Sequence, residues 1–494
     1  MRTWGTLTAV CLGTFMLLLD VSIAVVALPD MAGALHASLS DLQWVMDGYA
    51  LALAALLLGT GAAADILGRR RTHVVGVVVF ALASLVCGLA NGPGMLVTAR
   101  VVQGVGAAAM FATTLPLIGS VYQGRRRSVA LGVFGAVSGG AAAVGPVLGG
   151  LLTEGPGWRW IFWVNLPVSV AAVWLTLRVV PESRGPRGRR IDWAGTATFA
   201  AFAAGATFGV IRAGERGWGE RGALLALAGA AVALVAFVVV ERRSAHPMLD
   251  LALLRRPAFV GVMVGAFAFN AAAFGVLPYT SLWLQTLLGM DPVHGGLVFL
   301  SLSGASMVVA IAGGKLLHGV PARITVGGGL VLIGVGLCCQ AVLDAGSTWS
   351  ALVPGLLLTG IGVGLVSPGI AGAALATVEP ARAGMAGGSL NTFRQLGYAL
   401  GIAVFGTVVI SRMQDTLPRG AAHALAGGGA DGLRGRLPEQ ALHTAFAQGL
   451  NASFVLAGCV AIVAGLAVLV LVRSPAAPLA EATTPPKKAV GAPR

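Results

Sequence analysis

Ionisable side chains inside long apolar stretches are the residues of this chain whose chemistry is most informative. In "TFMLLLDVSIAVVALP" the single carboxylate, Asp20, lies thirteen residues after Leu7, or about 20 Å along a helix. A charged Asp near the middle of a membrane costs roughly 2.5 to 3.5 kcal/mol, and protonation removes much of that cost. If its surroundings change with conformation, this acid can take up a proton on one side of a membrane and release it on the other. A purely structural salt bridge is the alternative role.

Two further charged residues lie in apolar stretches of the first part of the chain. Asp47, in "LQWVMDGYALALAALLLG", either lies in water near the outer membrane surface or takes part in proton or substrate binding. Arg100, in "LVTARVVQGVGAAAM", shares a helical face with Gln103 by its i, i+3 spacing. Because an arginine cannot readily lose its proton, a buried Arg100 needs carbonyl groups, water or a carboxylate as partners.

The elements that must position these residues are membrane-spanning helices. The chain has 494 residues, of which 56% are hydrophobic and 11% charged, whereas soluble domains carry roughly a quarter charged residues. The mean hydropathy is +0.85. Each span needs about 20 apolar residues. The sequence therefore predicts an all-α polytopic membrane protein with fourteen transmembrane helices, at about 5–28, 42–64, 72–91, 94–120, 129–152, 160–180, 193–212, 222–241, 258–288, 293–317, 324–344, 350–375, 384–411 and 450–473.

The distribution of positive charge predicts the orientation of these spans. The net charge is +14, and 23 of the 33 Lys and Arg residues fall on the side of the N-terminus. Basic residues of short loops favour the cytoplasmic side. We therefore expect both termini in the cytoplasm and no nucleic-acid partner. The five cysteines and seven histidines show no metal-binding spacing, so we expect no metal, no cofactor and no disulfide framework.

A weak internal repeat predicts the domain organisation. "GAAADILGRRR" follows the second span and "GKLLHGVPAR" follows the tenth, each as an inside loop with a glycine and a terminal arginine. Two six-helix halves and an inserted helix pair follow from this correspondence. The predicted units are an N-terminal half (1–190), two extra helices (191–250), a C-terminal half (251–473) and a disordered cytoplasmic tail (474–494). Within the long outer loop near 412–449, the stretch "AGGGADGLRGR" is expected to be flexible.

The loop after the second span is a candidate conformational latch, because an acid and several arginines meet at a helix-ending glycine. It contains Gly61, Asp65, Gly68, Arg69 and Arg70. This stretch resembles the loop signature of the major facilitator superfamily, Gly-x-Leu-Ala-Asp-Arg-x-Gly-Arg-Arg. The isoleucine after the aspartate departs from that signature and removes one charge. An ordinary positive-inside anchor is the alternative for the arginines.

Three other stretches resemble signatures of the same superfamily. The run around Arg100 is similar to its fourth-helix signature, in which the arginine is implicated in proton transfer. "GVFGAVSGGAAAVGPVLGG" resembles the antiporter signature of drug exporters, and "GWRWIFWVNLP" continues the pattern of the fourteen-span drug:proton antiporters, with its tryptophans expected as an interfacial belt. The antiporter stretch carries Gly132, Gly145, Pro146, Gly149 and Gly150. Its glycines permit close helix packing whatever the function.

Polar residues in the apolar helices of the second half are candidate cavity residues. They belong to "LPYTSLWLQTLLG" and "GGSLNTFRQLGYALG", which also resemble the fourteen-span exporters. In the second stretch the three polar residues share one face through their i, i+3, i+4 spacing. Arg394 is alternatively a gate or a helix latch. Together with Gln103, the candidates are Tyr279, Trp283, Gln285, Asn391, Arg394 and Gln395.

The resemblance implies a proton-coupled exporter of lipophilic, often cationic, drug-like compounds in a bacterial inner membrane, acting by alternating access as a monomer. Asp20, Arg100 and Asp47 are the residues expected to couple protons to transport. Export of an endogenous secondary metabolite and proton-coupled uptake of a small nutrient are the alternatives. The sequence contains no HExxH, GxSxG or Walker-type run, so we expect neither an enzyme nor an ATP-driven pump.

Overall fold

The fold was analysed in a computed structural model, which describes residues 2–122, 124–184, 191–245, 247–316, 320–378, 383–430 and 432–472. These residues are helical apart from short connections and one isolated bridge between Arg434 and Leu437, and they contain no β-strand. The predicted all-α class is therefore confirmed. The predicted disordered tail, 474–494, lies outside the described residues.

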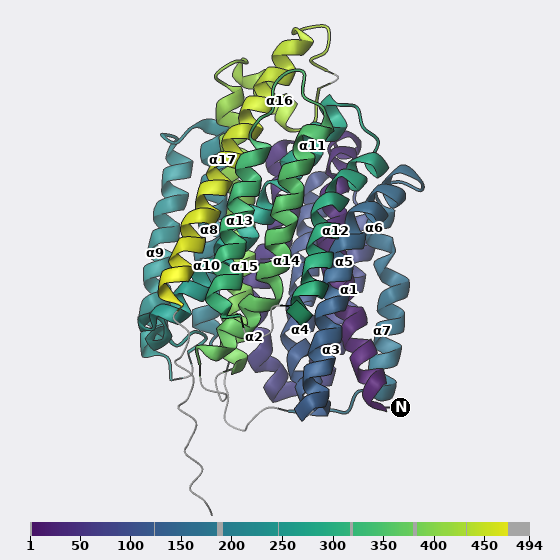
Figure 1. Cartoon of the computed structure of the whole chain (residues 1–494), viewed down its shortest axis with the longest axis vertical. Coiled ribbons are helices and arrows are strands. Elements are labelled where there is room, and N and C mark those ends of the chain that lie inside the picture. The colour runs from purple at the N-terminus through teal and green to yellow at the C-terminus, as the bar shows by residue number, and fades with distance from the viewer. Residues whose placement is uncertain are drawn as a thin grey trace, which may run out of the picture.

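The helices run roughly along the long axis of the molecule, with the start of α1 at the lower end of Figure 1 and α16 at the upper end. Most are long enough to cross a membrane, and the short ones interrupt or connect them. Their bounds are α1 (Arg2–Leu35), α2 (Leu39–Leu67), α3 (Arg69–Gly88), α4 (Pro93–Val121), α5 (Gly124–Glu154), α6 (Trp160–Trp163), α7 (Asn165–Val179), α8 (Trp193–Arg216), α9 (Arg221–Arg243), η1 (Leu251–Arg255), α10 (Pro257–Gly275), α11 (Leu277–Leu282), η2 (Trp283–Leu287), α12 (Pro292–Leu316), α13 (Ala322–Gln340), η3 (Trp349–Leu352), α14 (Val353–Ala376), α15 (Ala383–Met413), α16 (Arg419–Ala426) and α17 (Glu439–Leu471).

Thirteen helical segments of the described part of the chain are long and apolar enough to cross a membrane. The predicted span 129–152 lies within α5, which is not among the thirteen, so the number fourteen stays a prediction. The predicted span 258–288 is interrupted. It consists of α10, α11 and the π-helical turn η2, and Pro278 lies in the first turn of α11, where it has no N–H to donate.

The long upper connection near 412–449 includes a helix just before its glycine-rich stretch. It contains the helix α16, whose Ala422, Leu425 and Ala426 are buried. Ala430, beyond this helix, is also buried. Apolar residues at this spacing give a short helix one face to bury, and that signal outweighs the neighbouring glycines.

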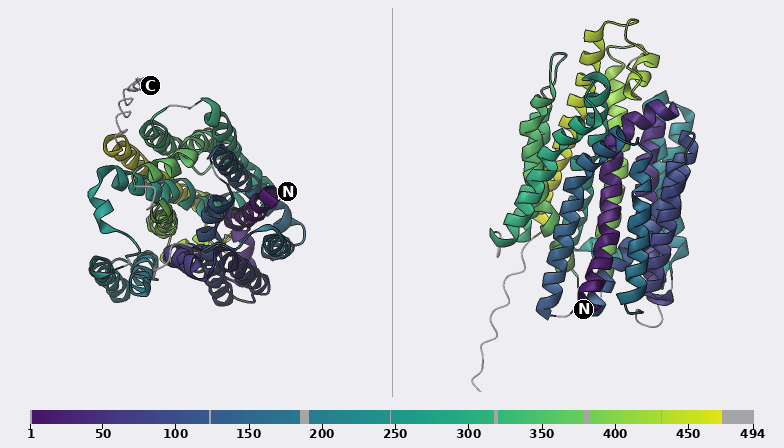
Figure 2. Two further views of the ribbon diagram at one scale, coloured as in Figure 1. Left: turned by 90° about the horizontal axis from the view of Figure 1, so that it is seen from below. Right: turned by 90° about the vertical axis from the view of Figure 1, so that its right-hand side faces the viewer.

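Helix contacts fall into two groups. In the first, α2 and α3 pack on α4, and α1 packs on α5 and α7. In the second, α13 packs on α14 and α17, α10 on α15 and α17, and α12 on α14. The groups meet through α2 with α15, α5 with α12, and α1 with α11, and we call this set of contacts the seam. Figure 2 shows the two groups from two further directions.

Small residues let α5 pack closely against α1 of its own group and against α12 across the seam. A Cβ on Gly149 would lie 3.0 Å from the Ile23 carbonyl oxygen of α1. A Cβ on Gly150 would lie 2.5 Å from the Pro292 carbonyl oxygen of α12. A Cβ on Gly296 would overlap the Pro146 carbonyl group. The backbones of α5 and α12 therefore touch directly, as small-residue pairs allow in membranes.

The pair α8 and α9 lies at the edge of the bundle (Figures 1 and 2). The helix α8 contacts both α15 and α2, so it covers one side of the seam, and its Val210 carbonyl accepts a bond of 3.1 Å from Thr407 of α15. Glu220 caps α9 by accepting a bond of 2.7 Å from the Ala223 N–H, and it pairs with Arg212 at 3.0 Å. Hydrogen bonds from Arg212 and from the Ala223 N–H hold the pKa of Glu220 at about 2.

Replacement of Gly150 by alanine tests the direct backbone contact in the seam. The added methyl group has backbone atoms of Pro292 and Val293 at 2.5 and 2.7 Å, so the helices must separate. We expect Gly150→Ala to lower stability by about 1 to 3 kcal/mol, a typical cost of overpacking. Thermal unfolding of the purified protein in detergent measures this loss.

Gly140 of the same helix provides the matched control. Among the described residues, a Cβ there has nothing within 4 Å. Gly140→Ala should leave stability unchanged or raise it by about 0.5 to 1 kcal/mol, because alanine favours a helix interior over glycine. Equal melting temperatures for the two variants would contradict the close seam.

Candidate functional site

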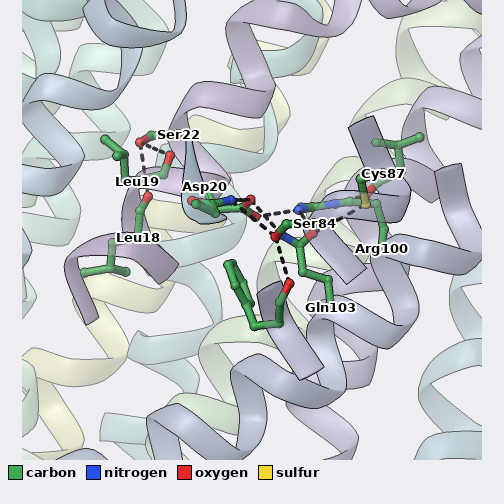
Figure 3. A network of polar contacts seen from close by, with 11 residues as sticks. Leu18, Leu19, Asp20, Ser22, Ser84, Cys87, Arg100 and Gln103 are labelled. Carbon is green, nitrogen blue, oxygen red and sulfur yellow. Dashed lines mark hydrogen bonds and ion pairs between the residues drawn. The ribbon is translucent and has the colours of Figure 1, made fainter. Parts of the chain in front are cut away.

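Asp20 is the centre of a buried polar cluster between α1, α4 and α7 (Figure 3). Its side chain is 2% exposed. Arg100 of α4 approaches one carboxylate oxygen with its Nη1 at 2.5 Å. The other oxygen accepts hydrogen bonds from the amides of Gln103, at 2.9 Å, and Asn165, at 3.0 Å. Three donors thus satisfy the carboxylate, and these hydrogen bonds stabilise an acid within this apolar helix.

Arg100 connects the Asp20 cluster to α2. Its Nε donates a bond of 3.0 Å to the Val45 carbonyl oxygen, and its guanidinium lies 4.3 Å from the ring centre of Tyr49. Its Nη1 also donates to Gln103 Oε1 at 2.7 Å. Its Nη2 has no hydrogen-bond partner among the described residues. The arginine therefore contacts a carboxylate on one side and the backbone of α2 on the other, while its Nη2 group is left without an acceptor among the described residues.

Two residues of α3, Ser84 and Cys87, contact the side chain of Gln103 and complete the cluster. The Gln103 amide donates to Ser84 Oγ at 2.8 Å, and Cys87 Sγ lies 3.8 Å from Gln103 Oε1. Satisfied partners fix the orientation of the amide, so it presents its N–H to Asp20 and its oxygen to Arg100. Removing one partner of a buried ion pair of this kind costs about 3 to 5 kcal/mol.

The structure brings together Asp20 and Arg100, both of which the resemblance implies as proton-coupling residues. Gln103, predicted as a cavity residue, lies instead inside this cluster with 0% exposure. Asn165 was missed, although it lies in the quoted stretch "GWRWIFWVNLP" as a polar residue among apolar ones. Trp158 of that stretch is 5% exposed, so it is a packed residue and not part of an interfacial belt, while Trp160 is exposed.

Asp47 is fully buried, which differs from a position in water near the membrane surface. Neither of its carboxylate oxygens has a hydrogen-bond partner among the described residues, and the same holds for the Tyr398 hydroxyl. Asp47 interacts electrostatically with Tyr398 and with Tyr279. This acid of α2 therefore faces residues of α11 and α15 across the seam.

Gln43, one turn before Asp47, makes the polar contact that closes the seam at this level. Its amide donates to the Tyr279 hydroxyl at 2.9 Å and to the Ile402 carbonyl oxygen at 3.3 Å. The Tyr279 hydroxyl also donates to the Ile402 carbonyl oxygen. Tyr279, a predicted cavity residue, is thus 1% exposed and bonded to both groups of helices.

The candidate latch is a compact turn between α2 and α3. Asp65 Oδ1 accepts bonds from Arg69 at 3.1 and 2.9 Å. Gly68 has φ +114°, a conformation that favours glycine, and it ends α2 and begins α3. Gly61 lies one helical turn before Asp65 on α2, where a Cβ would contact only Ala112 at 3.9 Å. The glycine and the Asp–Arg pair therefore fix the angle between two helices.

Glu182, beyond the end of α7, is the partner of this turn that the sequence motif did not reveal. One of its oxygens accepts bonds of 3.0 Å from the backbone N–H groups of Arg70 and Ser183. Its other oxygen lies 3.9 Å from Arg70 Nε and 3.8 Å from Arg71 Nε. A Cβ on Gly68 would lie 2.7 Å from the Glu182 carboxylate, so a side chain there would displace that carboxylate.

The stretch that resembles an antiporter signature packs α5 between α1 and α12. A Cβ on Gly145 would overlap the Ser22 hydroxyl of α1, two residues beyond Asp20. Pro146 lies inside α5 without an N–H to donate, and it faces Gly296 of α12. The surroundings of Gly132 lie outside the described residues.

The remaining predicted cavity residues do not form one pocket. Trp283 is 1% exposed, and its indole N–H has no partner among the described residues. Gln285 donates to the Val26 carbonyl oxygen of α1 at 2.8 Å, so it belongs to the seam. Asn391 donates to Gly387 of its own helix at 3.1 Å. Arg394 and Gln395 are partly exposed on α15.

This site belongs to a chain that is similar to known membrane transport proteins. The model of the Major Facilitator Superfamily matches residues 10–402. The multidrug resistance protein Stp of Mycobacterium tuberculosis is 37% identical over 413 residues, covering 83% of this chain and 77% of Stp. The tetracenomycin C resistance and export protein of Streptomyces glaucescens is 32% identical over 506 residues, covering 95% of this chain and 91% of that protein.

Among solved structures, a bacterial homologue of the human lysosomal transporter Spinster, in an inward-facing and unoccupied conformation, superposes with a TM-score of 0.64. The sequences are 17% identical, and the match covers 95% of this chain and 97% of that one. At this identity the likeness concerns the fold alone.

Removal of the Glu182 carboxylate tests its hold on the turn between α2 and α3. Glu182→Ala leaves the Arg70 and Ser183 N–H groups without their acceptor, which costs about 1 to 3 kcal/mol for buried groups and less for these partly exposed ones. We expect trypsin to cleave faster after the arginines at 69–71 in the purified protein. Glu154→Ala, at an exposed position of α5, is the control. Unchanged cleavage in Glu182→Ala would count against this contact.

Proposed function

Because this chain belongs to the major facilitator superfamily, we propose that it is a proton-coupled exporter of lipophilic drug-like compounds that works by alternating access. The membership makes it a multi-pass membrane transporter of the kind found in bacterial inner membranes rather than an enzyme. Its relatives named above carry the descriptions multidrug resistance and resistance and export. Those descriptions support a drug exporter.

The observation that carries the proposal is the Asp20 cluster. Arg100, Gln103 and Asn165 all donate to its carboxylate in a site shielded from water. Protonation removes the negative charge and with it most of the attraction for the guanidinium. A proton arriving at Asp20 therefore releases Arg100, and its departure restores the pair.

Two contacts couple this event to the seam. Arg100 bonds to the backbone of α2 at Val45, and α2 forms the seam with α15. Ser22, two residues after Asp20, lies against Gly145 of α5, which forms the seam with α12. A change in charge at Asp20 thus acts on both helices of the first group that must move. Such an element, biased by protonation and by cargo, is what coupling requires.

Asp47 is a second proton site in this scheme. It is buried without a hydrogen-bond donor in the described part of the chain, so its neutral form is the one that this closed seam accommodates. When α2 and α15 separate, water reaches the carboxyl group and favours its ionisation. Asp47 would then hold the seam closed when protonated and favour opening when charged.

We infer an inward-facing conformation from the separation of α5 and α12 toward the lower end, whereas α2 and α15 also stay in contact further down, where Thr392 donates to the Ala54 carbonyl oxygen at 3.3 Å. Residues 23–28 of α1 are all buried and the contacts of Gln43 and Gln285 lie in the same upper part, whereas residues 304–313 of α12 include no buried residue. The upper end is therefore the closed one, and it is the outer end if the termini are cytoplasmic. In this scheme units 1–190 and 251–473 rock against each other, and the pair within 191–250 follows at the edge.

The second candidate function is export of an endogenous secondary metabolite. It is favoured by the description of a relative as a tetracenomycin C resistance and export protein. Growth inhibition by a panel of antibiotics and dyes in an efflux-deficient host separates foreign drugs from a narrow cargo. Proton-coupled uptake of a nutrient is distinguished by the direction of movement under an imposed pH gradient.

The substitution Asp20→Asn tests proton coupling. Asparagine keeps the shape of the side chain but cannot be deprotonated, so Arg100 loses its counter-charge in every state. In proteoliposomes we expect dye accumulation driven by a pH gradient, and the accompanying proton flux, to fall to the level of protein-free liposomes. Asp344→Asn, at an exposed loop position, should behave as wild type. Coupled exchange at the wild-type rate in Asp20→Asn would refute the role of Asp20.

A further inference from the structure

One face of α15 carries four polar side chains, three of which are partly exposed. Asn391, Arg394, Gln395 and Tyr398 follow the i, i+3, i+4, i+7 spacing of a single face. Tyr398 is buried in the seam, whereas the other three are partly exposed below it. This face therefore runs from an accessible part of the helix up to the closed contact with α2.

Other faces of α15 make its helix contacts. A Cβ on Gly397 would overlap the Phe267 carbonyl group of α10, and a Cβ on Gly401 would lie 2.9 Å from Ala271 Cα. Thr392 donates to the Ala54 carbonyl oxygen of α2 at 3.3 Å. These backbone contacts hold α15 against α10 and α2 independently of the guanidinium of Arg394.

Arg394 is oriented but not neutralised. Its Nε donates to Asn270 Oδ1 of α10 at 3.3 Å, and its guanidinium lies 5.4 Å from the ring centre of Phe269. Among the described residues no carboxylate lies within 4.0 Å of its nitrogens. Its two terminal nitrogens have no hydrogen-bond acceptor in the same part of the chain. The Asn270 amide and the Phe269 ring hold the guanidinium at its Nε side, and the two Nη groups remain available to a ligand.

The depth of Arg394 makes an unneutralised charge expensive. It lies eleven residues beyond Ala383, or about 16 Å along α15, which is roughly the middle of a hydrocarbon core. Arg100, the buried arginine of the first helix group, is paired with Asp20. Arg394 must therefore find its compensation in water or in a ligand.

The acids of the seam and of the first helix group are not available to bind a cation on this face. Asp20 is satisfied by three donors, and Asp47 is 0% exposed. The accessible formal charge at mid-depth on α15 is positive. This differs from the sequence-based expectation of an often cationic cargo.

We propose that Arg394 binds an anionic oxygen group of the cargo, such as a carboxylate or a phenolate on an aromatic compound, and that Asn270 is its positioning residue. The inference rests on the proposed export function and names the charge of its substrate class. A guanidinium fork matches two oxygens of a carboxylate, and the partly exposed amides of Asn391 and Gln395 lie on the same face to serve further oxygens.

Two xanthene dyes of similar size and opposite charge provide the test, fluorescein as the anion and rhodamine 123 as the cation. Binding is measured by fluorescence polarisation to the purified full chain in phosphatidylcholine nanodiscs, without a proton gradient. We expect the wild type to bind fluorescein more tightly than rhodamine 123. Arg394→Gln should weaken fluorescein binding roughly tenfold or more, the effect of losing a charge-assisted hydrogen bond, and leave rhodamine binding unchanged or stronger.

Two further variants separate charge from fold. Asn270→Asp places a carboxylate against Arg394 without changing side-chain shape, so it should weaken fluorescein binding while Arg394 remains in place. Arg394→Lys should keep the preference for the anion with reduced affinity, because an ammonium cannot form the fork. Arg412→Gln, an exposed arginine near the upper end of the same helix, is the matched control.

Preference of the wild type for rhodamine 123, failure of the wild type to bind fluorescein, or equal losses for both dyes in Arg394→Gln would each overturn the proposal. Equal losses would indicate a gate or a helix latch instead. The outcome is independent of proton coupling, because no gradient is applied. Loss of fluorescein binding in Arg394→Gln together with normal coupled transport in Asp20→Asn would retain the anion site and reject the proposed coupling residue.

Discussion

The ion pair between Asp20 and Arg100 is the interaction on which the arrangement of the first helix group depends. Neither charge is tolerable alone at this depth, so α1 and α4 must bring them together, and α7 and α3 must supply the amide and hydroxyl groups that complete their hydrogen bonds. Arg100 then reaches α2 through a backbone carbonyl group and a tyrosine ring. The helices α1, α3, α4 and α7, and α2 of the seam, are thereby tied to one buried carboxylate. The hydrogen bonds of the cluster lie within its own helix group, and across the seam Arg100 interacts with Tyr398 of α15 only electrostatically.

The contacts of the seam can part without leaving an ion pair broken. Between α5 and α12 it consists of glycine and proline backbones in contact, which gain dispersion energy only at close range and lose it without leaving buried charges unpaired. Its described hydrogen bonds are few, and Gln43 and Gln285 donate to carbonyl groups that water can satisfy equally well once the helices part. The ion pairs of Asp20 and of the turn at Gly68 lie within one group of helices instead. Ion pairs stabilise the first helix group, whereas close backbone contacts and a few amide hydrogen bonds hold the two groups together.

Much of this could be predicted from the sequence, because membranes impose simple costs. Apolar length predicts the spans, and the cost of a buried charge predicts that Asp20 and Arg100 need partners. What could not be predicted depends on which helices become neighbours. Gln103 shares a face with Arg100, but nothing in its spacing says that Asp20 and not a cavity lies opposite. Asn165 and Glu182 become partners only after α7 folds back beside α1 and α3. The break between α10 and α11 escaped notice because Pro278 follows a long apolar run, which by hydropathy reads as one uninterrupted span.

The distribution of compensated and uncompensated charge also bears on how a proton and a cargo are exchanged. If one acid bound both, each would have to displace the other, and the cargo would have to be a cation. Here the acid that is best placed for the proton is satisfied by its own helix group, while the arginine that lacks a carboxylate lies in the other group, on the far side of α2. Under the proposals made for Asp20 and Arg394, proton and cargo never compete for a group. They act on each other only through the position of α2 and the opening of its contact with α15, so the coupling resides in the seam between them.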